Sequence, residues 1–432
     1  MMDAVFDWAS GVRFQTCFFG LKVLARWRKM RMKFNKSGQL LLVSAASLLV
    51  AGLLSACASL TVDFVYVTSA KAAGTYSYGE VDVFEVNSES GFMRQIPTSP
   101  FPSGGRNPVA EAVSSDNTYL YVANQDDNTI VQFVIGNDGK IYPQYTVNTP
   151  GIYPMAVAVN GSNLFVVDTY QPLPSCSSAA PCSGSIAVLP ITPATSTVAA
   201  SLGLPVANGS LTYWPLSVPS APNDVILPTS VAVLASGADV YVTAYDTTAS
   251  KGYVFGFSVG SGGVLTALNG GVPFAAGTHP SGITSDPTGA YVYVTDSING
   301  VVLGYKVSSG SLITMSGSPF AAGGQPSAMA IDSTGKYAYV TNAGDSTVTA
   351  YSVSSGVLSR LGSYATGLQP VAIGIDPSLN NYVYTANFLG NNVSGFQLNL
   401  STGALLNTQE APYNSNAQPT AIAAISHGAK TK

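Results

Sequence analysis

Three residues of this chain have side chains that suit the hydrolysis of an ester: His279, Arg106 and Glu111. A histidine or a glutamate can act as a general acid or base, and an arginine can bind an oxyanion or a phosphate group through two parallel hydrogen bonds. Such side chains are scarce, because beyond residue 56 the sequence has two histidines and three arginines: His279, His427, Arg94, Arg106 and Arg360.

The contexts of these residues suggest a common location. His279 lies in G-T-H-P, Arg106 lies in G-G-R-N-P, and Glu111 follows shortly after that second proline. If the two prolines begin equivalent strands, His279, Arg106 and Glu111 would converge at the end of one channel as a catalytic site. The alternative is that each is an isolated polar residue of a loop or of the channel wall.

A second set of polar residues follows short apolar runs: Asn124, Asp168, Asp296, Asn342 and Asn387. Side by side, they would form a polar ring able to bind a sugar or a cation, and the segment N-Q-D-D-N (124–128) has the oxygen ligands that calcium takes. The alternative is structural, because Asn and Asp side chains often hydrogen-bond their own backbone in turns.

The elements that would position these residues come from an internal repeat. Residues 326–370 contain four strand-length runs, 327–331, 337–341, 347–353 and 357–363, separated by turns rich in Gly, Ser, Asn and Asp. We label these runs strands a, b, c and d. Strand b recurs seven times, with an aromatic ring at Tyr66, Tyr121, Phe165, Tyr241, Tyr293, Tyr339 and Tyr384. Four strands repeated about every 40–50 residues are typical of a β-propeller.

The phase of the repeat predicts how the ring closes. The first unit begins with strand b, and the chain ends on an unmatched strand a, PTAIAAI (419–425). Pairing this strand with the first unit would remove the exposed edges of an open array. We therefore predict an all-β, seven-bladed propeller in which the C-terminal segment is the innermost strand of the N-terminal blade. The recurring tyrosines are expected to pack between blades.

The N-terminal part lies outside the repeat. From residue 32 it has a basic start, an apolar run (40–54) and the ending L-S-A-C, which predict a signal peptide over 30–57. This ending resembles the bacterial lipobox, which implies that Cys57 carries lipid and anchors the protein to a membrane; the alternatives are an ordinary cleaved signal or a membrane-spanning anchor. Residues 1–29 are then an extension or a misassigned start, and residues 58–432 form one domain. Ala58 favours an outer-membrane location.

Cysteine content and charge fit export. Cys176 and Cys182 lie in one short segment, S-C-S-S-A-A-P-C-S-G, and are predicted to form a local disulfide, with a metal site as the alternative. The chain beyond residue 56 keeps 10 basic and 20 acidic residues, so a basic surface for nucleic acid is not expected.

Insertions gather in the b–c loops and in one d–a connection. The enlarged segments are 69–79, 169–183, 245–251 and 201–227. Because function is often placed in loops on a rigid scaffold, we expect an interaction face there, with Tyr213 and Trp214 as a contact pair. The alternative is that 201–227 only caps blades 3 and 4.

The repeat resembles that of a known family. The segments PSGITSDPTGAYVYVTD (280–296), PSAMAIDSTGKYAYVTN (326–342) and PVAIGIDPSLNNYVYTAN (370–387) are similar to YVTN-type repeats and to the seven-bladed lactonase family, which includes 6-phosphogluconolactonase-like propellers. The resemblance implies a sugar-lactone hydrolase with His, Arg and Glu around the channel.

Because such residues are sparse here, the sequence favours a binding scaffold that presents its outward loops to a protein or a glycan. A lactonase-like hydrolase and a structural cell-envelope component are the alternatives. No cofactor is expected, and the protein is expected to be a monomer.

Overall fold

The computed structural model describes residues 61–70, 78–195, 199–377, 379, 381–415 and 418–426, with the side chain of Val62 excepted. They belong to one compact unit that begins at Thr61. The predicted extension (1–29), the signal peptide with Cys57, and His427 lie outside the described residues. Within the described ranges, no helix is long and apolar enough to cross a membrane.

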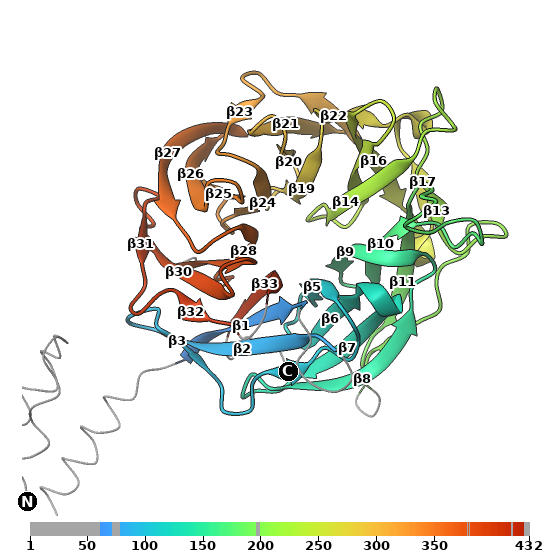
Figure 1. Cartoon of the computed structure of the whole chain (residues 1–432). Coiled ribbons are helices and arrows are strands. Elements are labelled where there is room, and N and C mark those ends of the chain that lie inside the picture. Colours follow the sequence, from blue (N-terminus) through green and yellow to red (C-terminus); the bar gives the residue numbers. More distant parts are fainter. Residues whose placement is uncertain are drawn as a thin grey trace, which may run out of the picture. The chain divides into compact units, whose positions relative to one another are not determined.

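Seven antiparallel sheets surround a central axis, as predicted (Figure 1). Blade 1 contains β33 (Pro419–Ser426), β1 (Thr61–Ser69), β2 (Glu80–Asn87), β3 (Met93–Gln95) and β4 (Phe101–Pro102). Blade 2 contains β5 (Pro108–Val113), β6 (Tyr119–Asn124), β7 (Thr129–Ile135) and β8 (Ile141–Asn148). Blade 3 contains β9 (Ile152–Asn160), β10 (Asn163–Tyr170), β11 (Ser185–Thr192), β12 (Ser201–Leu202) and β13 (Trp214–Pro215).

The remaining blades follow the same order. Blade 4 contains β14 (Ile226–Val233), β15 (Asp239–Asp246), β16 (Lys251–Val259), β17 (Leu265–Ala267) and β18 (Phe274–Ala275). Blade 5 contains β19 (Pro280–Ser285), β20 (Tyr291–Asp296), β21 (Val301–Ser308), β22 (Ser311–Thr314) and β23 (Phe320–Ala321). Blade 6 contains β24 (Pro326–Ile331), β25 (Tyr337–Asn342), β26 (Thr347–Ser354) and β27 (Val357–Ala365). Blade 7 contains β28 (Pro370–Ile375), β29 (Tyr382–Asn387), β30 (Asn392–Leu398), β31 (Leu405–Asn407) and β32 (Tyr413–Asn414).

The C-terminal strand closes the ring. β33 pairs antiparallel with β1 along Asp63–Ser69, and β1 pairs on its other side with β2. The innermost strands of all blades, β33, β5, β9, β14, β19, β24 and β28, surround the axis (Figure 1). The predicted closure is confirmed, and it leaves no inner strand of blade 1 unpaired.

The outermost strand is more complex than predicted. In five blades it is split into two short pieces that both pair with strand c, as β22 and β23 do with β21. Only blades 2 and 6 keep it continuous, as β8 and β27. In four of the split strands a proline followed by an aromatic residue begins or directly precedes the second piece, at 100–101, 273–274, 319–320 and 412–413. Proline cannot donate a hydrogen bond to the sheet ladder, which accounts for the interruption.

Strand b holds the next blade through an aromatic–x–aromatic pair. In blade 5 the Tyr293 hydroxyl donates a hydrogen bond of 2.6 Å to the carbonyl oxygen of Gly356 in the c–d turn of blade 6. The Tyr291 ring covers the same glycine so closely that a Cβ there would lie 2.5 Å from it. Equivalent hydrogen bonds join Tyr66 to Gly139, Tyr241 to Gly310 and Tyr339 to Gly403. The recurring tyrosines are therefore interblade core, as expected.

We expect Tyr339→Phe to lower the free energy of unfolding by about 1–2 kcal/mol, because it leaves the buried Gly403 carbonyl without its 3.0 Å partner. The matched control is Tyr384→Phe, since no described residue hydrogen-bonds the equally buried Tyr384 hydroxyl. That control should be neutral or slightly stabilising. Urea titrations of the two variants check the difference, and equal losses would contradict the role of the hydrogen bond.

The innermost strands are joined by a second set of hydrogen bonds. Each innermost strand has a proline at or near its start, and the next residue is often Ser or Thr. The hydroxyl of this residue donates a hydrogen bond to the carbonyl oxygen of the corresponding proline in the following blade. Ser327 donates to the Pro370 oxygen at 2.7 Å, and Thr420 donates to the Pro108 oxygen at 2.9 Å. These contacts fix the spacing of the strands around the axis.

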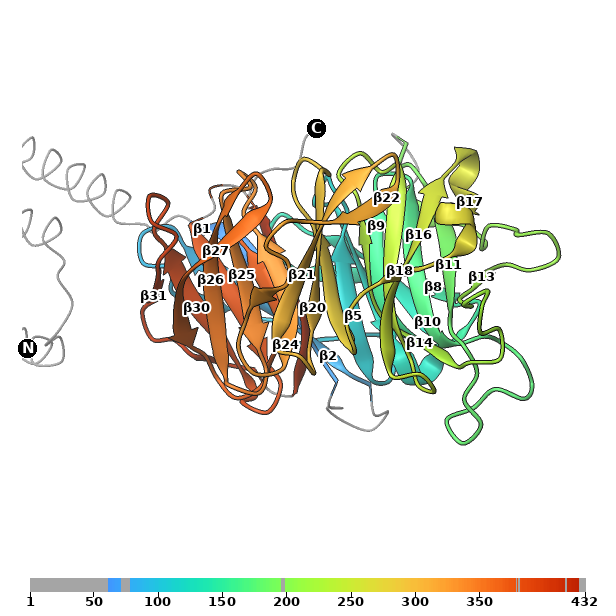
Figure 2. The same ribbon diagram turned by 90° about the horizontal axis from the view of Figure 1, so that it is seen from above.

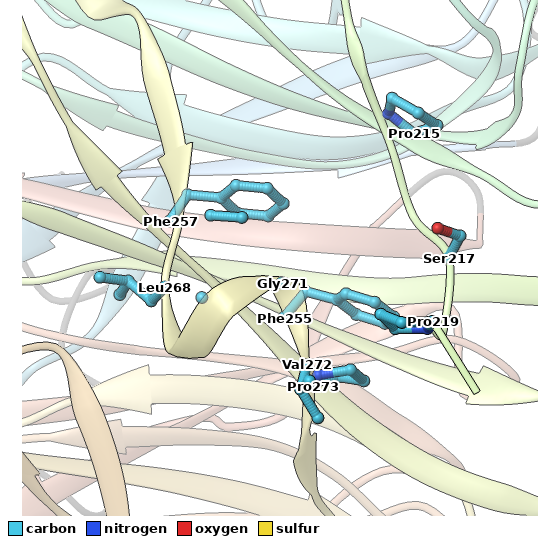
Figure 3. A pocket seen from close by; sticks show the side chains of 11 residues that line it. Pro215, Ser217, Pro219, Phe255, Phe257, Leu268, Gly271, Val272 and Pro273 are labelled. Carbon is cyan, nitrogen blue, oxygen red and sulfur yellow. The ribbon is translucent and has the colours of Figure 1, made fainter.

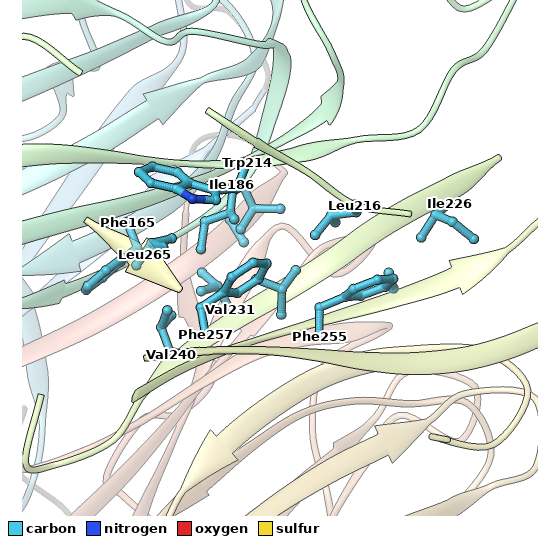
Figure 4. Packing of buried hydrophobic residues seen from close by; sticks show 14 of the residues in the cluster. Phe165, Ile186, Trp214, Leu216, Ile226, Val231, Val240, Phe255, Phe257 and Leu265 are labelled. Carbon is cyan, nitrogen blue, oxygen red and sulfur yellow. The ribbon is translucent and has the colours of Figure 1, made fainter. Parts of the chain in front are cut away.

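Apolar residues fill the interfaces between blades. The cluster between blades 3 and 4 brings Trp214, Ile186 and Leu216 against Val231 and Phe257 (Figure 4). Trp214 and Tyr213 are 7% and 5% exposed. The predicted contact pair of the interaction face is therefore not available at the surface, and the alternative applies. β13, which contains Trp214, pairs with β11, so the indole turns into the core and the 201–227 insert caps blades 3 and 4.

Candidate functional site

One end of the axis is surrounded by the residues that directly precede the first proline of each innermost strand. These residues, which we call the axial ring, are Asn107, Tyr153, Leu227, His279, Gln325, Gln369 and Gln418. They are half-buried apart from Gln325, which is exposed. In five blades the carbonyl oxygen of the axial-ring residue accepts a hydrogen bond from the residue that follows strand b, as His279 does from the Ser297 N–H at 3.0 Å.

Three contacts, two in blade 5 and one with blade 4, hold the backbone and the ring of His279. Its backbone N–H donates to the Asp296 carboxylate at 3.2 Å, and its Nδ1 lies 3.2 Å from the Ser297 Oγ. Its ring stacks on Tyr245 of blade 4, with the ring centroids 4.1 Å apart and the planes tilted by 33°. A histidine held on one face and at one nitrogen has a defined orientation at the axis.

Aromatic residues continue from His279 toward blade 3. Tyr245 lies beside Tyr170, and burial followed by the charge of Tyr170 raises the pKa of Tyr245. Tyr170 in turn meets Tyr153 edge to face, with centroids 6.0 Å apart. We call Tyr153, Tyr170, Tyr245 and His279 the aromatic arc. Its three tyrosines were not predicted from the sequence, although Tyr153 precedes a proline of an innermost strand as His279 does.

Apart from Leu227 of blade 4, the rest of the axial ring is made of amides. Gln325, Gln369, Gln418 and Asn107 occupy equivalent positions in blades 6, 7, 1 and 2, and we call them the amide arc. The Asn107 amide donates to Gln125 Oε1 at 3.0 Å and to Asp126 Oδ1 at 3.1 Å. The axial ring therefore divides into an aromatic side and a neutral hydrogen-bonding side.

Arg106 is bound by acidic neighbours in its own blade. Its Nη2 lies 2.6 Å from Asp127 Oδ1, its Nε donates to the same oxygen at 2.6 Å, and Nη2 also reaches the Asp126 carbonyl at 3.1 Å. Two of the predicted calcium ligands in 124–128, Asp126 and Asp127, are therefore bound to an arginine. Of the described residues, no group of three or more His, Cys, Asp or Glu side chains is arranged to hold a metal ion.

Glu111 is enclosed between blades 1 and 2. It lies on β5 and pairs with Val122, its carboxyl accepts a hydrogen bond from the Thr68 hydroxyl of β1, and the Ala423 backbone of β33 donates another. The equivalent positions of the other blades are apolar, for example Ile283 and Met329. Burial raises the pKa of Glu111 to about 8, although both hydrogen bonds act to lower it.

The three residues of the predicted catalytic site have separate surroundings. Among the described contacts, no hydrogen bond or ion pair joins any two of His279, Arg106 and Glu111. Arg106 and Asn107 directly precede β5 of blade 2, whereas His279 directly precedes β19 of blade 5. Of the three, only His279 belongs to the axial ring itself, and its catalytic role stays a prediction.

The buried Glu111 carboxyl predicts that stability depends on pH. Its folded pKa lies above the unfolded value, so its contribution is complete below about pH 4.5 and is lost as the pH rises toward about 8. We expect Glu111→Gln to flatten this decline by about 1–3 kcal/mol between pH 5 and pH 8.5. Urea titrations at both pH values check this, with the exposed Glu89→Gln as control. Parallel pH profiles of wild type and Glu111→Gln would contradict it.

The five Asn and Asp residues in the last part of strand b are fully buried, and their side chains form hydrogen bonds mainly within their own blades and the connections that lead into them. Asn342 accepts a hydrogen bond from the Gly323 N–H at 2.9 Å, and Asn387 donates to Ser394 at 2.9 Å. Burial would raise the pKa of Asp296, but N–H donors of Thr278, His279 and Asn299 hold it below its usual value. Burial raises the pKa of Asp168 to about 7. These contacts fit the structural alternative, in which the Asn and Asp side chains organise the turns through hydrogen bonds.

Cys176 and Cys182 form a disulfide in the b–c connection of blade 3, as predicted. The loops near β11 and β13 extend outward from the blades (Figure 2).

A small cavity of about 210 Å³ lies at the outer strands of blade 4. Figure 3 shows the rings of Phe255 and Phe257 directed toward the segment of the 201–227 insert that carries Pro215 and Pro219. Its lining includes Ser217 and carries no titratable side chain. It therefore lacks the groups that acid–base chemistry needs, and it is far in the fold from the axial ring, which belongs to the innermost strands.

Comparison with known structures finds the same fold in bacterial proteins. A candidate 6-phosphogluconolactonase from Bacteroides fragilis is 19% identical, with a TM-score of 0.65 over 84% of this chain and 98% of its own. The periplasmic gluconolactonase of Pseudomonas aeruginosa is 18% identical, with a TM-score of 0.65 over 84% of this chain and 99% of its own. A search of curated proteins found no match.

The family model described as "Lactonase, 7-bladed beta-propeller" matches residues 77–172 and 232–422. The gap between these ranges holds the whole 201–227 insert, which caps blades 3 and 4 without altering the ring. Blade number, closure by β33 and the match over most of the repeat agree, and the chain belongs to the seven-bladed β-propeller lactonase family.

Proposed function

We propose that this protein hydrolyses a neutral sugar lactone at the axial ring, with His279 as the general base. The observation that carries the proposal is the placement of His279: it is a histidine at the end of the axis, oriented by Tyr245 and Ser297. Family membership makes lactone hydrolysis the reaction to expect, and it favours this reading over the binding scaffold that the sparse catalytic residues suggested.

The hydrogen bonds around His279 support a defined tautomer. Ser297 Oγ donates its single proton to the His279 carbonyl oxygen, 3.1 Å away. Ser297 Oγ can then accept a hydrogen bond from the His279 Nδ1–H, at 3.2 Å. Nε2 then carries the lone pair, and no described residue hydrogen-bonds it. A neutral imidazole with a free Nε2 is the form that removes a proton from water.

The reaction needs no cofactor. Nε2 takes a proton from water as the oxygen attacks the lactone carbonyl carbon. The tetrahedral intermediate then collapses with cleavage of the ring C–O bond, and the leaving alkoxide takes the proton from the imidazolium. Water has been added across the ester bond, and the product is a hydroxy acid.

The charges near the axis favour a neutral substrate over a phosphorylated one. Phosphate recognition usually relies on arginine or lysine. Arg106 is already paired with Asp127, and Arg94 with Glu85. Arg360 lies on β27, the outermost strand of blade 6. The amide arc instead offers neutral donors and acceptors, which match the hydroxyl groups of an unmodified sugar.

Turnover of neutral lactones by the purified protein tests the proposal. Glucono-1,5-lactone, galactono-1,4-lactone and an acyl-homoserine lactone are incubated at a pH where spontaneous opening is slow, and the acid product is titrated. We expect hydrolysis of at least one sugar lactone above the uncatalysed rate. Failure on every lactone would overturn the proposal.

Binding of a neutral glycan without turnover is the second candidate. It is favoured by the four amides of the axial ring, which suit recognition of hydroxyl groups whether or not a reaction follows. A scaffold would show saturable saccharide binding by calorimetry and no lactone turnover. A structural cell-envelope role would instead require self-association, which sedimentation measures.

We further propose that the protein acts outside the bacterial cytoplasm, as a monomer anchored through lipid on Cys57, with the outer membrane as the expected location. The Cys176–Cys182 disulfide supports this, because disulfides persist in oxidising compartments. Fractionation of cells by membrane type tests it, and recovery in the cytoplasm would contradict it.

A further inference from the structure

The aromatic arc spans the inner ends of three consecutive blades. Tyr153 comes from blade 3, Tyr245 from blade 4 and His279 from blade 5, and all three are half-buried. Tyr170 is 8% exposed and lies beside both Tyr153 and Tyr245. Half-buried rings that pack on a buried ring keep a fixed orientation while part of their surface stays open to solvent.

Tyr153 is held in an unusual backbone conformation. Its φ is 60°, in the left-handed region that bulky residues avoid. Its N–H donates to Asn128 Oδ1 at 2.7 Å, and its carbonyl accepts from the Thr169 hydroxyl at 2.8 Å. Strain of this kind persists where the surroundings fix it, and it is concentrated at functional sites. The axial-ring residues of blades 2, 6 and 7 that are also left-handed are Asn107, Gln325 and Gln369. Tyr153 is therefore the aromatic residue among these four left-handed positions.

Charge is absent from the arc apart from what His279 can carry. The described contacts of Tyr153, Tyr170 and Tyr245 include no Lys or Arg side chain, so an anionic ligand has no counter-ion there. Around the ring from His279 come the amides of Gln325, Gln369 and Gln418. An apolar aromatic face beside neutral donors and acceptors complements a pyranose, which has an apolar C–H face and a rim of hydroxyl groups.

We propose that the aromatic arc is a stacking subsite for a pyranose ring of a neutral saccharide. The placement of the lactone beside His279 rests on the proposed function, and the substrate is then the lactone end of a disaccharide or longer chain rather than a single sugar. Tyr245 and His279 would receive the lactone ring, and Tyr153 the next sugar residue.

Saccharide binding, measured without any reaction, tests the subsite. Calorimetric titrations of the full chain use cellotetraose, maltotetraose and xylotetraose up to 10 mM. We expect at least one to bind, Tyr153→Ala to weaken that binding at least about tenfold, and Tyr153→Phe to stay within about twofold of wild type. Tyr142→Ala, at a residue 51% exposed on the outer strand β8, is the control that should not change binding.

The subsite and the lactonase reaction fail separately. The proposal is overturned if no tetrasaccharide binds, or if a folded Tyr153→Ala binds as wild type does. If Tyr153→Ala does not fold, Tyr245→Ala against Tyr245→Phe makes the same test. Binding that depends on Tyr153 with no lactone turnover would retain the subsite and reject the hydrolase. With turnover, KM for cellobiono-1,5-lactone should rise more in Tyr153→Ala than KM for glucono-1,5-lactone, and equal rises would overturn the subsite.

Discussion

Replacing His279 with alanine is expected to lower kcat/KM for a neutral sugar lactone by about 10²–10⁴-fold. The variant loses the only imidazole of the axial ring and, with it, the group that takes a proton from water. Because the loss falls on the chemical step, most of it should appear in kcat rather than in KM. Initial rates by acid release measure both parameters.

Two further variants separate the chemistry from packing. Ser297→Ala removes the hydroxyl that holds Nδ1 at 3.2 Å, and it should cause a smaller loss of kcat with a changed pH profile, because the tautomer is no longer fixed. His427→Ala, outside the described residues, should act as wild type does. Wild-type rates in His279→Ala would place the catalytic group elsewhere.

The largest effect on stability is expected from Gly356→Ala, about 2–5 kcal/mol. Gly356 has a φ of 82°, which an alanine adopts only with strain, and the new Cβ would lie 2.5 Å from the Tyr291 ring and 2.9 Å from Met315 Cε. Any shift of the turn also disturbs the Tyr293 hydrogen bond to its carbonyl. Urea titration gives the loss.

Gly271→Ala is the matched control for this effect. Its φ is also 82°, but no atom lies within 4 Å of the added Cβ. It therefore carries the backbone strain alone and should cost about 1–2 kcal/mol. If the two variants lose the same stability, the strand-b tyrosines do not clamp the turn of the next blade.

Residues that repeat in several blades could be predicted from sequence because their geometry requires their type. The Asp286 carboxylate accepts the Tyr291 N–H at 2.8 Å in the a–b turn, and Asp332 does the same for Tyr337. Gly356 and Gly403 occupy positive φ at the c–d turn. Such local requirements recur at a fixed spacing, so blade number, strand order and closure followed from them.

Features that occur in one blade could not be predicted in the same way. Glu111 occupies a position that is Ile283 or Met329 in other blades, and nothing near it in sequence shows that Thr68 and Ala423 enclose it. Trp214 was predicted as a contact residue because its segment is an insertion, yet β13 pairs with β11 and buries it. Both outcomes depend on contacts between segments far apart in the chain.

The candidate site shows the same division. His279 and its place before a strand proline were evident from the sequence. Its partner Tyr245 was not, because the equivalent residues after strand b are Gln125, Ser297, Ala343 and Phe388, with no common type. Arg106 was predicted to share a catalytic site with His279, but its guanidinium forms an ion pair with Asp127 of its own blade.

The ratio of kcat/KM for glucono-1,5-lactone to that for its 6-phosphate tests the central claim most directly. A neutral axial ring with its nearest arginine paired to Asp127 predicts that the unphosphorylated lactone is hydrolysed at least about tenfold more efficiently. A phosphorylated substrate turned over faster would contradict the account, since it would require a cationic site that the axial ring does not provide among the described residues.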